Sequence, residues 1–349
     1  MRLFFELNRE SLESYCDEHG MPKYLADQLA GWVYLKGVVD PAAMTNISRR
    51  HRQTIANTMR FYAGDIEAHQ VASDRTQKLL IRWPEEEASG NEENPRRTEC
   101  VMIPSGRRRT ACVSSQVGCA MRCRFCASGL GGLEANLRQG RIVEQVHRLG
   151  RLEDAGRITN VVFMGMGEPL ANYAAVTEAI RTINARWGLG IGARRITVST
   201  VGLPGAIRRL IDFEVPVTLA LSLHAPNDEL RRELIPGARS TTIAQLLDAC
   251  GAYFEATGRE ITLEYLLLRG VNDRTGHARQ LAEIARQIRA NVNLIRYNEV
   301  KGLPFNRPTT GDVRAFQDVL HRRGVKAHLR ASRGRDIAAA CGQLRHEHR

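Results

Sequence analysis

The sequence lacks any apolar run that approaches the roughly 20 residues needed to cross a membrane. Its first residues, MRLFFELNRESLES, become acidic too early for a secretory signal peptide. Internal repeats and low-complexity segments are also missing. These absences predict a globular, cytoplasmic protein that makes no membrane contact.

Acidic residues are scarce relative to basic ones. The chain has 38 Asp and Glu against 50 Lys and Arg, which gives a formal charge of +12. A basic excess attracts polyanions, of which nucleic acid is the commonest, although a generally basic composition would look the same. Seven arginines surround a cysteine cluster, and this position favours a polyanionic substrate: Arg96, Arg97, Arg107, Arg108, Arg109, Arg122 and Arg124.

The eight cysteines are not expected to form structural disulfides. A chain of 349 residues can bury a large core without such links, and a cytoplasmic protein keeps its thiols reduced. Clustered cysteines therefore indicate metal or redox chemistry. Four of them lie in the stretch CVSSQVGCAMRCRFC, which covers residues 112–126. We expect Cys16, Cys100 and Cys250, which lie outside it, to be small buried hydrophobic residues.

Within this stretch Cys119, Cys123 and Cys126 have the spacing C-x3-C-x2-C. A structural zinc site usually adds a second pair of cysteines, and no second C-x2-C pair lies nearby. Three cysteines on one tight loop suit three irons of a cubane cluster and leave the fourth iron open to a substrate. A structural zinc site remains an alternative at this point.

The hydrophobic pattern predicts three regions. Residues 1–65 are expected to form a small helical accessory domain, with helices at 12–18, 23–35 and 46–63. Residues 66–108 are expected to form a linker and a β-hairpin, with strands at 78–83 and 98–103 around an acidic loop at 84–95. Residues 109–349 alternate between strand-like and amphipathic runs, which predicts a parallel sheet covered by helices.

Six such units are too few for a closed eight-stranded barrel, so the expected fold is α/β, an open partial (β/α)6 barrel. The strand-like runs are 110–114, 159–164, 195–199, 217–223, 261–268 and 291–295, with a candidate seventh at 325–330; helices are expected at 142–152, 173–187, 243–257 and 275–289. In such folds the chemistry lies at the carboxyl ends of the strands. Polar residues do follow the strands, and they predict one shared pocket: Gly167, Glu168, Ser199, Ser222, His224 and Asn298.

Several motifs together resemble the RlmN/Cfr family of radical S-adenosylmethionine (SAM) methyltransferases, which act on ribosomal RNA adenine. The resemblance extends from about Glu99 to Cys341 and is looser across the N-terminal helices. It rests on CVSSQVGCAMRCRFC at 112–126, GMGEP at 165–169, STVG at 199–202, LSLHAPND at 221–228, RGVND at 269–273 and RGRDIAAACGQ at 333–343.

The resemblance implies a role for each matching position. Cys119, Cys123 and Cys126 would hold one [4Fe–4S] cluster, whose open iron would bind SAM. The expected SAM contacts are Gly167, Glu168, Ser199, Ser222, Leu223, His224 and Asn298. A carboxylate such as that of Glu168 suits the ammonium group of SAM.

The resemblance also implies the chemistry. C2 of adenine is electron-poor and cannot attack the methyl group of SAM, so a carbon radical is needed. In the family one SAM methylates the tail cysteine, here Cys341, and a second SAM yields the radical that activates this methyl group. Cys112 would then resolve the protein–RNA adduct by forming a disulfide with Cys341, helped by the basic Arg107–Arg109. Glu99 has the spacing of the family's proposed proton acceptor.

The expected reaction is C2 methylation of an adenine in 23S rRNA, with tRNA as a second candidate substrate and a flavodoxin-like protein as the electron donor to a monomeric enzyme. Methylation at C8, as in the Cfr branch, is the alternative within the family. A non-catalytic iron–sulfur or zinc protein that binds nucleic acid is the alternative from another class. Two positions depart from the family pattern, Arg296 and Arg335, and both add positive charge.

Overall fold

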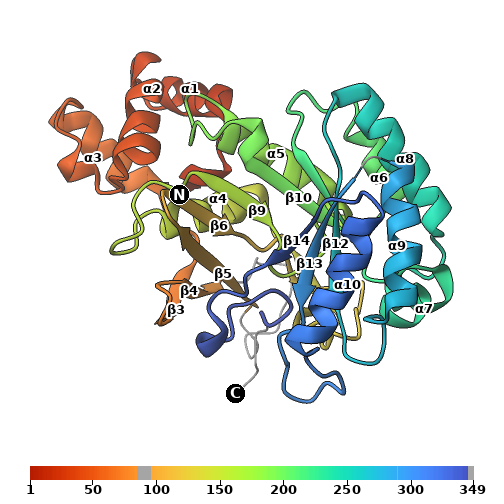
Figure 1. The fold of residues 1–349 in the computed structure, drawn as a ribbon. Helices are drawn as coiled ribbons and strands as arrows, with labels where there is room; N and C mark the ends of the chain where they lie inside the picture. The colour runs from red at the N-terminus through yellow and green to blue at the C-terminus, as the bar shows by residue number, and fades with distance from the viewer. Residues whose placement is uncertain (85–95, 289, 345–349) are drawn as a thin grey trace.

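The computed structural model describes residues 1–84, 96–288 and 290–344, and its centre is a ten-stranded mixed sheet (Figure 1). The strand order is β14-β13-β12-β11-β10-β9-β6-β5-β4-β3. The strands are β3 (Asp65–Val71), β4 (Gln77–Trp83), β5 (Arg96–Ser105), β6 (Arg108–Cys112), β9 (Asn160–Phe163), β10 (Ile196–Thr200), β11 (Thr218–Ser222), β12 (Thr262–Leu267), β13 (Asn291–Arg296) and β14 (Ala327–Arg330).

The seven strands from β6 to β14 pair in parallel in chain order, as the sequence predicts, and the candidate seventh strand is present as β14. No pairing among the described residues joins β14 back to β6, so the sheet is open. The predicted α/β fold, an open partial barrel, is therefore confirmed.

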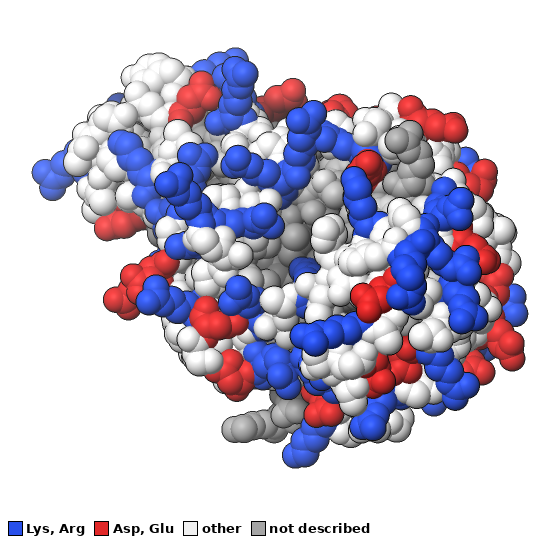
Figure 2. All heavy atoms as spheres, viewed as in Figure 1, with Lys and Arg blue, Asp and Glu red and all other residues white. Residues whose placement is uncertain are grey.

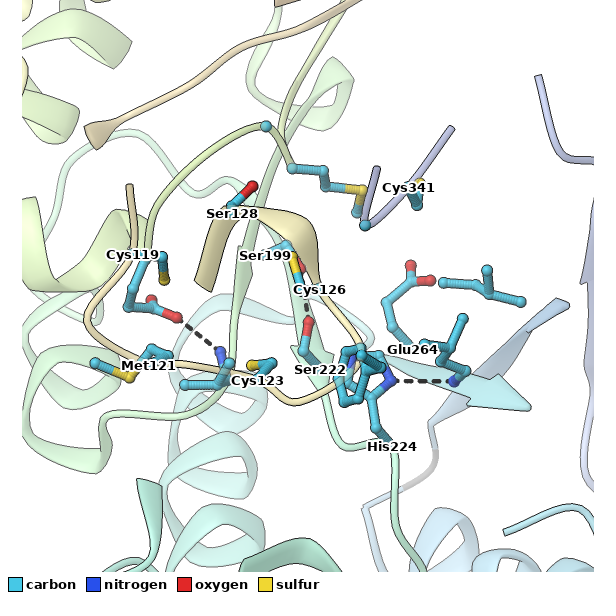
Figure 3. A pocket seen from close by; sticks show the side chains of 18 of the residues that line it. Cys119, Met121, Cys123, Cys126, Ser128, Ser199, Ser222, His224, Glu264 and Cys341 are labelled. Atoms are coloured by element: carbon cyan, nitrogen blue, oxygen red, sulfur yellow. Dashed lines mark hydrogen bonds between the residues drawn. The ribbon is translucent and has the colours of Figure 1, made fainter. Parts of the chain in front are cut away.

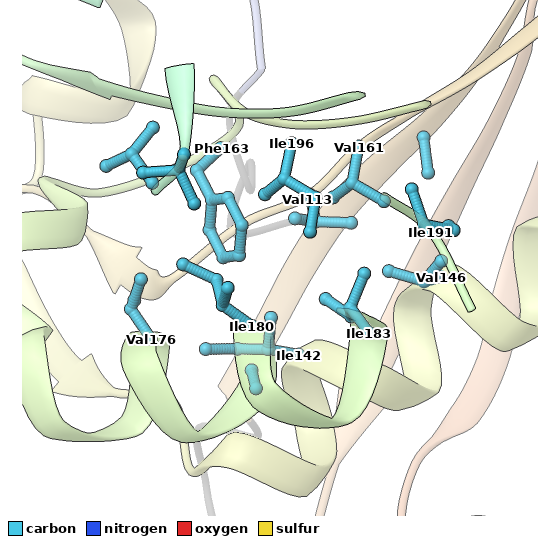
Figure 4. Close-up of a cluster of buried hydrophobic side chains, with 14 of the residues drawn as sticks. Val113, Ile142, Val146, Val161, Phe163, Val176, Ile180, Ile183, Ile191 and Ile196 are labelled. Carbon is cyan, nitrogen blue, oxygen red and sulfur yellow. The ribbon is translucent and has the colours of Figure 1, made fainter. Parts of the chain in front are cut away.

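Helices cover the parallel strands on the outside (Figure 1). They are α4 (Gln139–Leu149), α5 (Tyr173–Asn184), α6 (Pro204–Arg209), α7 (Asp228–Leu234), α8 (Ile243–Thr257), α9 (Thr275–Gln287) and α10 (Thr310–Arg322). Figure 4 shows how the core forms: Ile142 and Ile180, from α4 and α5, face Val161 and Phe163 of β9. The parallel pairing of the strands brings their carboxyl ends to one edge of the sheet.

The segment before the parallel sheet contains one strand that the sequence pattern does not predict. The expected hairpin forms as β4 and β5, and β3 adds a third antiparallel strand at the edge. Its sequence, DIEAHQV, alternates only over Ile66 and Ala68, which is a weak strand signal, and nearly every residue of β3 is exposed. We call β3, β4 and their connecting turn the extension. Most of the acidic loop, residues 85–95, and the end of the predicted helix at residue 289 lie outside the described residues.

The N-terminal region contains α1 (Arg9–Glu18), α2 (Tyr24–Ala30) and α3 (Arg49–Thr58), and its buried side chains belong to the same hydrophobic cluster as the sheet. The predicted helix at 46–63 ends at Thr58, and the next two residues pair as β2 (Met59–Arg60) with β1 (Arg2–Leu3). A last small sheet joins β7 (Gln116–Gly118) to β8 (Leu133–Asn136). No helix within the described residues is long and apolar enough to span a membrane.

His147 of α4 joins the N-terminal region to the core. Its Nε2 donates to the carbonyl oxygen of Val33 at 3.0 Å, so Nδ1 accepts from the Tyr62 hydroxyl at 3.0 Å. Both ring nitrogens are therefore satisfied in the neutral ring. Burial is the main cause that lowers the pKa of His147 from 6.5 to about 4.

We expect this histidine to make the folded protein less stable as the pH is lowered. Between pH 6.5 and 4 the unfolded chain binds a proton at His147 that the folded chain refuses, so the free energy of unfolding decreases as pH decreases. From pH 7.5 to 5 the His147 contribution is about 2 kcal/mol. Urea unfolding of wild type and His147→Gln at both pH values measures it. An equal loss of stability in both proteins would contradict the assignment.

Candidate active site

A cavity lies at the carboxyl edge of the parallel strands, where the sequence predicts one (Figure 3). Its empty volume is about 830 Å3 including the open mouth, which is within the range of small-molecule sites. We call it the cluster cavity. Most of the predicted site residues line it: Cys119, Cys123, Cys126, Gly167, Glu168, Ser199, Ser222, His224 and Cys341.

The three cysteines of the C-x3-C-x2-C loop all face this cavity (Figure 3). The Cys119 amide donates to the Gly132 carbonyl at 2.7 Å, and the Cys126 amide donates to the Cys123 carbonyl at 3.1 Å, so the loop is tightly folded. Burial raises the pKa of all three thiols, to about 12 for Cys119. Bound thiolates at this place would therefore need the positive charge of a metal group.

The arrangement fits a multinuclear cluster better than a single ion. Within residues 1–84, 96–288 and 290–344, no three Cys, His, Asp or Glu side chains converge closely enough to hold one metal ion. A tetrahedral zinc needs its sulfurs about 2.3 Å from one centre, whereas each cysteine of a cubane binds a different iron. The three thiols that surround one cavity without converging could therefore hold three corners of a [4Fe–4S] cluster.

The Glu168 carboxylate lines the cluster cavity together with these cysteines. Its Oε1 accepts from the Leu170 amide at 3.0 Å and its Oε2 from the Val201 amide at 2.8 Å. Burial raises the pKa of Glu168, and these hydrogen bonds oppose that effect. The Thr200 side chain also hydrogen-bonds to this carboxylate, so one of its four lone-pair sites is left for a further donor, such as the ammonium group of SAM. Gly167 precedes it with φ +102°, where a side chain would strike Gln116.

The next two strands add hydroxyl groups and a neutral histidine. Ser199 and Ser222 lie with their Oγ atoms 3.1 Å apart. The His224 Nδ1 accepts from the Leu266 amide at 3.0 Å, which leaves the ring proton on Nε2. Burial, helped by the Arg231 cation, lowers the pKa of His224 to about 3, so the ring stays neutral and can donate to a ligand.

Two predicted SAM contacts lie elsewhere. The side chain of Leu223 is fully buried in the main hydrophobic cluster, and its amide donates to the Glu264 carbonyl at 3.1 Å. Asn298 lies beside a second cavity, which we call the thiol cavity, and its Nδ2 donates to the Cys341 carbonyl at 3.5 Å. The side chains of Leu223 and Asn298 therefore do not line the cluster cavity, and their contacts with SAM stay predictions.

Cys341 lines both the cluster cavity and the thiol cavity, and Cys112 lines the latter. The two thiols are 229 positions apart in sequence, but they lie close enough that a charge on Cys341 raises the pKa of Cys112. Burial and the Cys341 thiolate raise the pKa of Cys112 to about 12, which the Arg330 cation opposes. The three cysteines expected to be inert, at positions 16, 100 and 250, are buried as predicted.

The basic neighbour of the thiols is Arg330 and not the predicted Arg107–Arg109. Cys112 ends β6, whereas Arg107–Arg109 lie at its beginning, four residues or about 13 Å away at the usual rise per residue. Arg330 lines both cavities and lies 3.7 Å from the Glu264 carboxylate. Sequence analysis missed Arg330, at the carboxyl end of β14, and Glu264, in the middle of β12, although both lie on predicted strands.

Replacing Arg330 by methionine should slow formation of the Cys112–Cys341 disulfide about tenfold. A rise of about one unit in the pKa of Cys112 lowers the thiolate fraction by this factor. The physical reason is that the cation favours the Cys112 thiolate. Mass spectrometry after brief diamide oxidation at pH 8 measures the rate. Arg330→Lys keeps the charge and should restore most of it, and equal rates in all three proteins would contradict this role.

Glu99 lies apart from both cavities, on β5. It forms an ion pair with Lys78, at 2.7 Å between Oε1 and Nζ, and both side chains are buried. Residues Lys78 and Cys112 both pair with Val101, two positions after Glu99, so all four side chains share one face of the sheet. Glu99 faces a third, wider cavity between the extension and the C-terminal loops.

The two departures from the family pattern differ in position. The Arg296 guanidinium is used structurally, since its Nε donates to the Pro308 carbonyl at 2.8 Å and its Nη1 to Thr310 Oγ1 at 3.3 Å. Arg335 is exposed and lines the wide cavity beside Glu99. Only Arg335 therefore adds positive charge to a cavity.

The open parallel sheet with a three-cysteine loop defines a radical SAM enzyme, and comparison with known proteins agrees. Residues 113–286 match the radical SAM superfamily, and residues 4–60 match the N-terminal domain of ribosomal RNA large subunit methyltransferases. A probable dual-specificity RNA methyltransferase RlmN from Salinibacter ruber is 44% identical, with 98% of this chain and 93% of that protein covered.

A protein of the same name from Synechococcus sp. strain CC9311 is 45% identical, with 98% and 97% covered. A crystal structure of a radical SAM methyltransferase from Sphaerobacter thermophilus has a TM-score of 0.92 at 40% identity and covers 99% of both chains. The chain belongs to the RlmN family of radical SAM RNA methyltransferases. Radical SAM enzymes use a [4Fe–4S] cluster and SAM, which confirms the predicted cofactors.

Proposed function

We propose that this enzyme methylates C2 of an adenine in 23S rRNA, with tRNA as a second substrate, through a methyl group carried on Cys341. The observation that carries the proposal is the position of Cys341 at both the cluster cavity and the thiol cavity. One sulfur can thus face SAM in one step and Cys112 in another. The name of the relatives, dual-specificity RNA methyltransferase RlmN, supports the choice of C2.

The residues that line the cluster cavity would bind the cluster and SAM. Cys119, Cys123 and Cys126 would hold the cluster, which supplies the electron that cleaves SAM into a carbon radical. Glu168 would bind the SAM ammonium group, while Ser199, Ser222 and His224 would donate to its other polar atoms. Glu168, Ser199 and His224 are buried, which would keep water from the radical.

The thiols would complete the reaction. Cys341 accepts a methyl group from one SAM, loses a hydrogen atom from it to the radical formed from a second SAM, and joins adenine through the resulting methylene. The adduct would give its unpaired electron back to the oxidised cluster and the proton of the reacting carbon to Glu99. Cys112 would then attack the sulfur of Cys341, so that an S–S bond forms as the bond from that sulfur to the methylene carbon breaks, and that carbon takes up a proton to become the methyl group.

The partners follow from charge and chemistry. Lys and Arg side chains cover much of the face in Figure 2, including the part over the N-terminal helices. On α3, Arg49 and Arg50 are exposed and no acidic residue lies in the helix. We propose that residues 1–65 form an accessory region that contacts RNA phosphates, and that a flavodoxin-like protein in the cytoplasm reduces the cluster of a monomeric enzyme.

Anaerobic reconstitution with iron, sulfide, SAM and a reductant tests the function. A 23S rRNA fragment and tRNA are supplied, each with deuterium at C2 of adenine, and mass spectrometry locates the methyl group. We expect 2-methyladenine with loss of one deuterium for each methyl group gained. A methyl group found on C8 would contradict the proposed C2 methylation and show that the enzyme methylates C8. A colourless protein with one zinc per chain and no SAM cleavage would refute the function.

A further inference from the structure

Hydrogen bonds join the extension to the loop that carries Cys341. These contacts come from the turn between β3 and β4 and from the first residues of β4. The Asp336 Oδ2 accepts from the Ser73 amide at 2.8 Å, and the Asp74 Oδ2 accepts from the Gly334 amide at 3.2 Å. Lys78 Nζ donates to the Ala338 carbonyl at 3.4 Å. Each contact joins segments about 260 positions apart.

Asp74 organises its own turn as well as the loop. Its Oδ1 accepts from the Thr76 amide at 3.0 Å, and its Oδ2 lies 3.8 Å from the Arg333 guanidinium. Burial raises the pKa of Asp74, but the hydrogen bonds from Thr76 and Gly334 and the charge of Arg333 outweigh it, so the net pKa is lowered. The carboxylate is therefore favoured in the charged form that these contacts need.

The loop is shaped to meet the turn at close range. Gly334 has φ +60°, and a side chain there would lie 2.8 Å from Thr76 Cγ2, so the backbone can approach only because glycine is present. The Ala339 amide then donates to the Gly334 carbonyl at 2.8 Å, which closes the loop two residues before Cys341.

The other side of Cys341 is attached to the cluster loop. The Ala127 amide donates to the Gly342 carbonyl at 2.8 Å, and Ser128 Oγ donates to the Leu344 carbonyl at 2.6 Å. Cys341 therefore lies between two anchors, the extension before it and the cluster loop after it. The second anchor belongs to the metal-binding loop, but the first belongs to a part of the chain outside the parallel sheet.

The composition of β3 indicates what the extension is for. Of its seven residues only Ala68 is even partly buried, so the strand contributes almost nothing to the hydrophobic core. Its clearest structural consequence is to complete the turn that holds Asp74 and Ser73 against the tail loop.

We propose that Asp74 and Asp336 are positioning residues which hold the Cys341 loop against the extension, so that the sulfur reaches the cluster cavity. This role rests on the proposed function of Cys341 as methyl carrier. Without the contacts the loop would sample many conformations, and the sulfur would meet the methyl group of SAM less often. The contacts act on the loop alone, so cluster assembly does not depend on them.

The test uses Asp74→Ala, Asp336→Ala and the double variant in the full chain. Asp65→Ala is the matched control, because it removes an exposed carboxylate from the same extension and breaks only a pair with Arg82. Asp74→Asn is the conservative variant, since its amide oxygen can still accept from the Gly334 amide. Hydrogen exchange over residues 332–341 reports the loop directly, and mass spectrometry reports the fraction of Cys341 that carries a methyl group.

We expect at least tenfold faster exchange in the loop of the double variant, a fivefold or greater loss of methyl-Cys341, and unchanged iron content. Asp74→Asn should recover much of the methylation, and Asp65→Ala should match wild type. Unchanged exchange and methylation in the double variant would overturn the proposal, as would an equal effect of Asp65→Ala. If wild type carries no methyl-Cys341 but the exchange result holds, the carrier function fails while the anchoring of the loop stands.

Discussion

Replacing Cys341 by alanine is expected to lower RNA methylation by at least about a thousandfold, to the background of the assay. The sulfur is the proposed carrier of the methyl group, and no other described thiol lines both cavities. The fold should survive because the side chain is only half-buried and the hydrogen bond from Asn298 goes to the Cys341 main-chain carbonyl, which alanine keeps.

Cys250→Ala is the matched control for this experiment. It also removes one thiol, but from α8 in the main core, where the side chain is buried and lines neither cavity. Liquid chromatography and mass spectrometry of the digested RNA measure methyl transfer, and visible absorbance measures the cluster. Cys341→Ala should keep its cluster and lose methyl transfer. Normal turnover by this variant would refute the carrier mechanism.

Replacing Cys112 by alanine is expected to trap the protein on its RNA. The methyl carrier, the cluster cysteines and Arg330 remain, so the bond between Cys341 and adenine should still form. Without the Cys112 thiolate no disulfide can replace the bond from sulfur to carbon, and the adduct should accumulate toward one RNA per active chain. The site predicts this outcome because Cys112 and Cys341 line the same cavity.

Denaturing electrophoresis with labelled RNA detects this adduct as a band that nuclease digestion removes and thiol reductants do not. The double variant Cys112→Ala with Cys341→Ala should show no band, since the attachment atom is gone. Cys100→Ala is the positional control: Cys100 neighbours Val101, the partner of Cys112 across β5 and β6, but packs in the main core on the other face. Release of RNA by Cys112→Ala at the wild-type rate would assign Cys112 another role.

Much of the fold could be predicted because its signals are local. The parallel strands are short apolar runs bounded by turns, and their amphipathic helices lie between them, so each can be recognised within about a dozen residues. The strand β3 could not be recognised in this way, because an exposed edge strand has no continuous apolar face that the sequence pattern would show. The helix predicted through residue 63 also ends at Thr58, where pairing of β2 with β1 takes over the backbone.

The candidate site also has features that could be predicted from local sequence and features that could not. The spacing of Cys119, Cys123 and Cys126 is a local property of one loop, and the motif match extended that prediction to the tail cysteine. The prediction that Arg107–Arg109 lie beside the Cys112 thiol is wrong because residues that are close in sequence need not be close in space. A strand moves about 3.3 Å for each residue, so charges a few residues from Cys112 are carried away from it.

The sequence by itself determined the alternation of strands and helices, the three-cysteine loop and the identity of the two thiols set apart from it. Only the tertiary structure decided that Arg330 faces those thiols, that Lys78 pairs with Glu99, and that Asp74 and Asp336 join the Cys341 loop to the extension. The physical reason is the range of the interactions. Periodicity and loop spacing are set by neighbours along the chain, whereas these ion pairs and hydrogen bonds depend on strand register and on closure of the chain over as many as 263 positions.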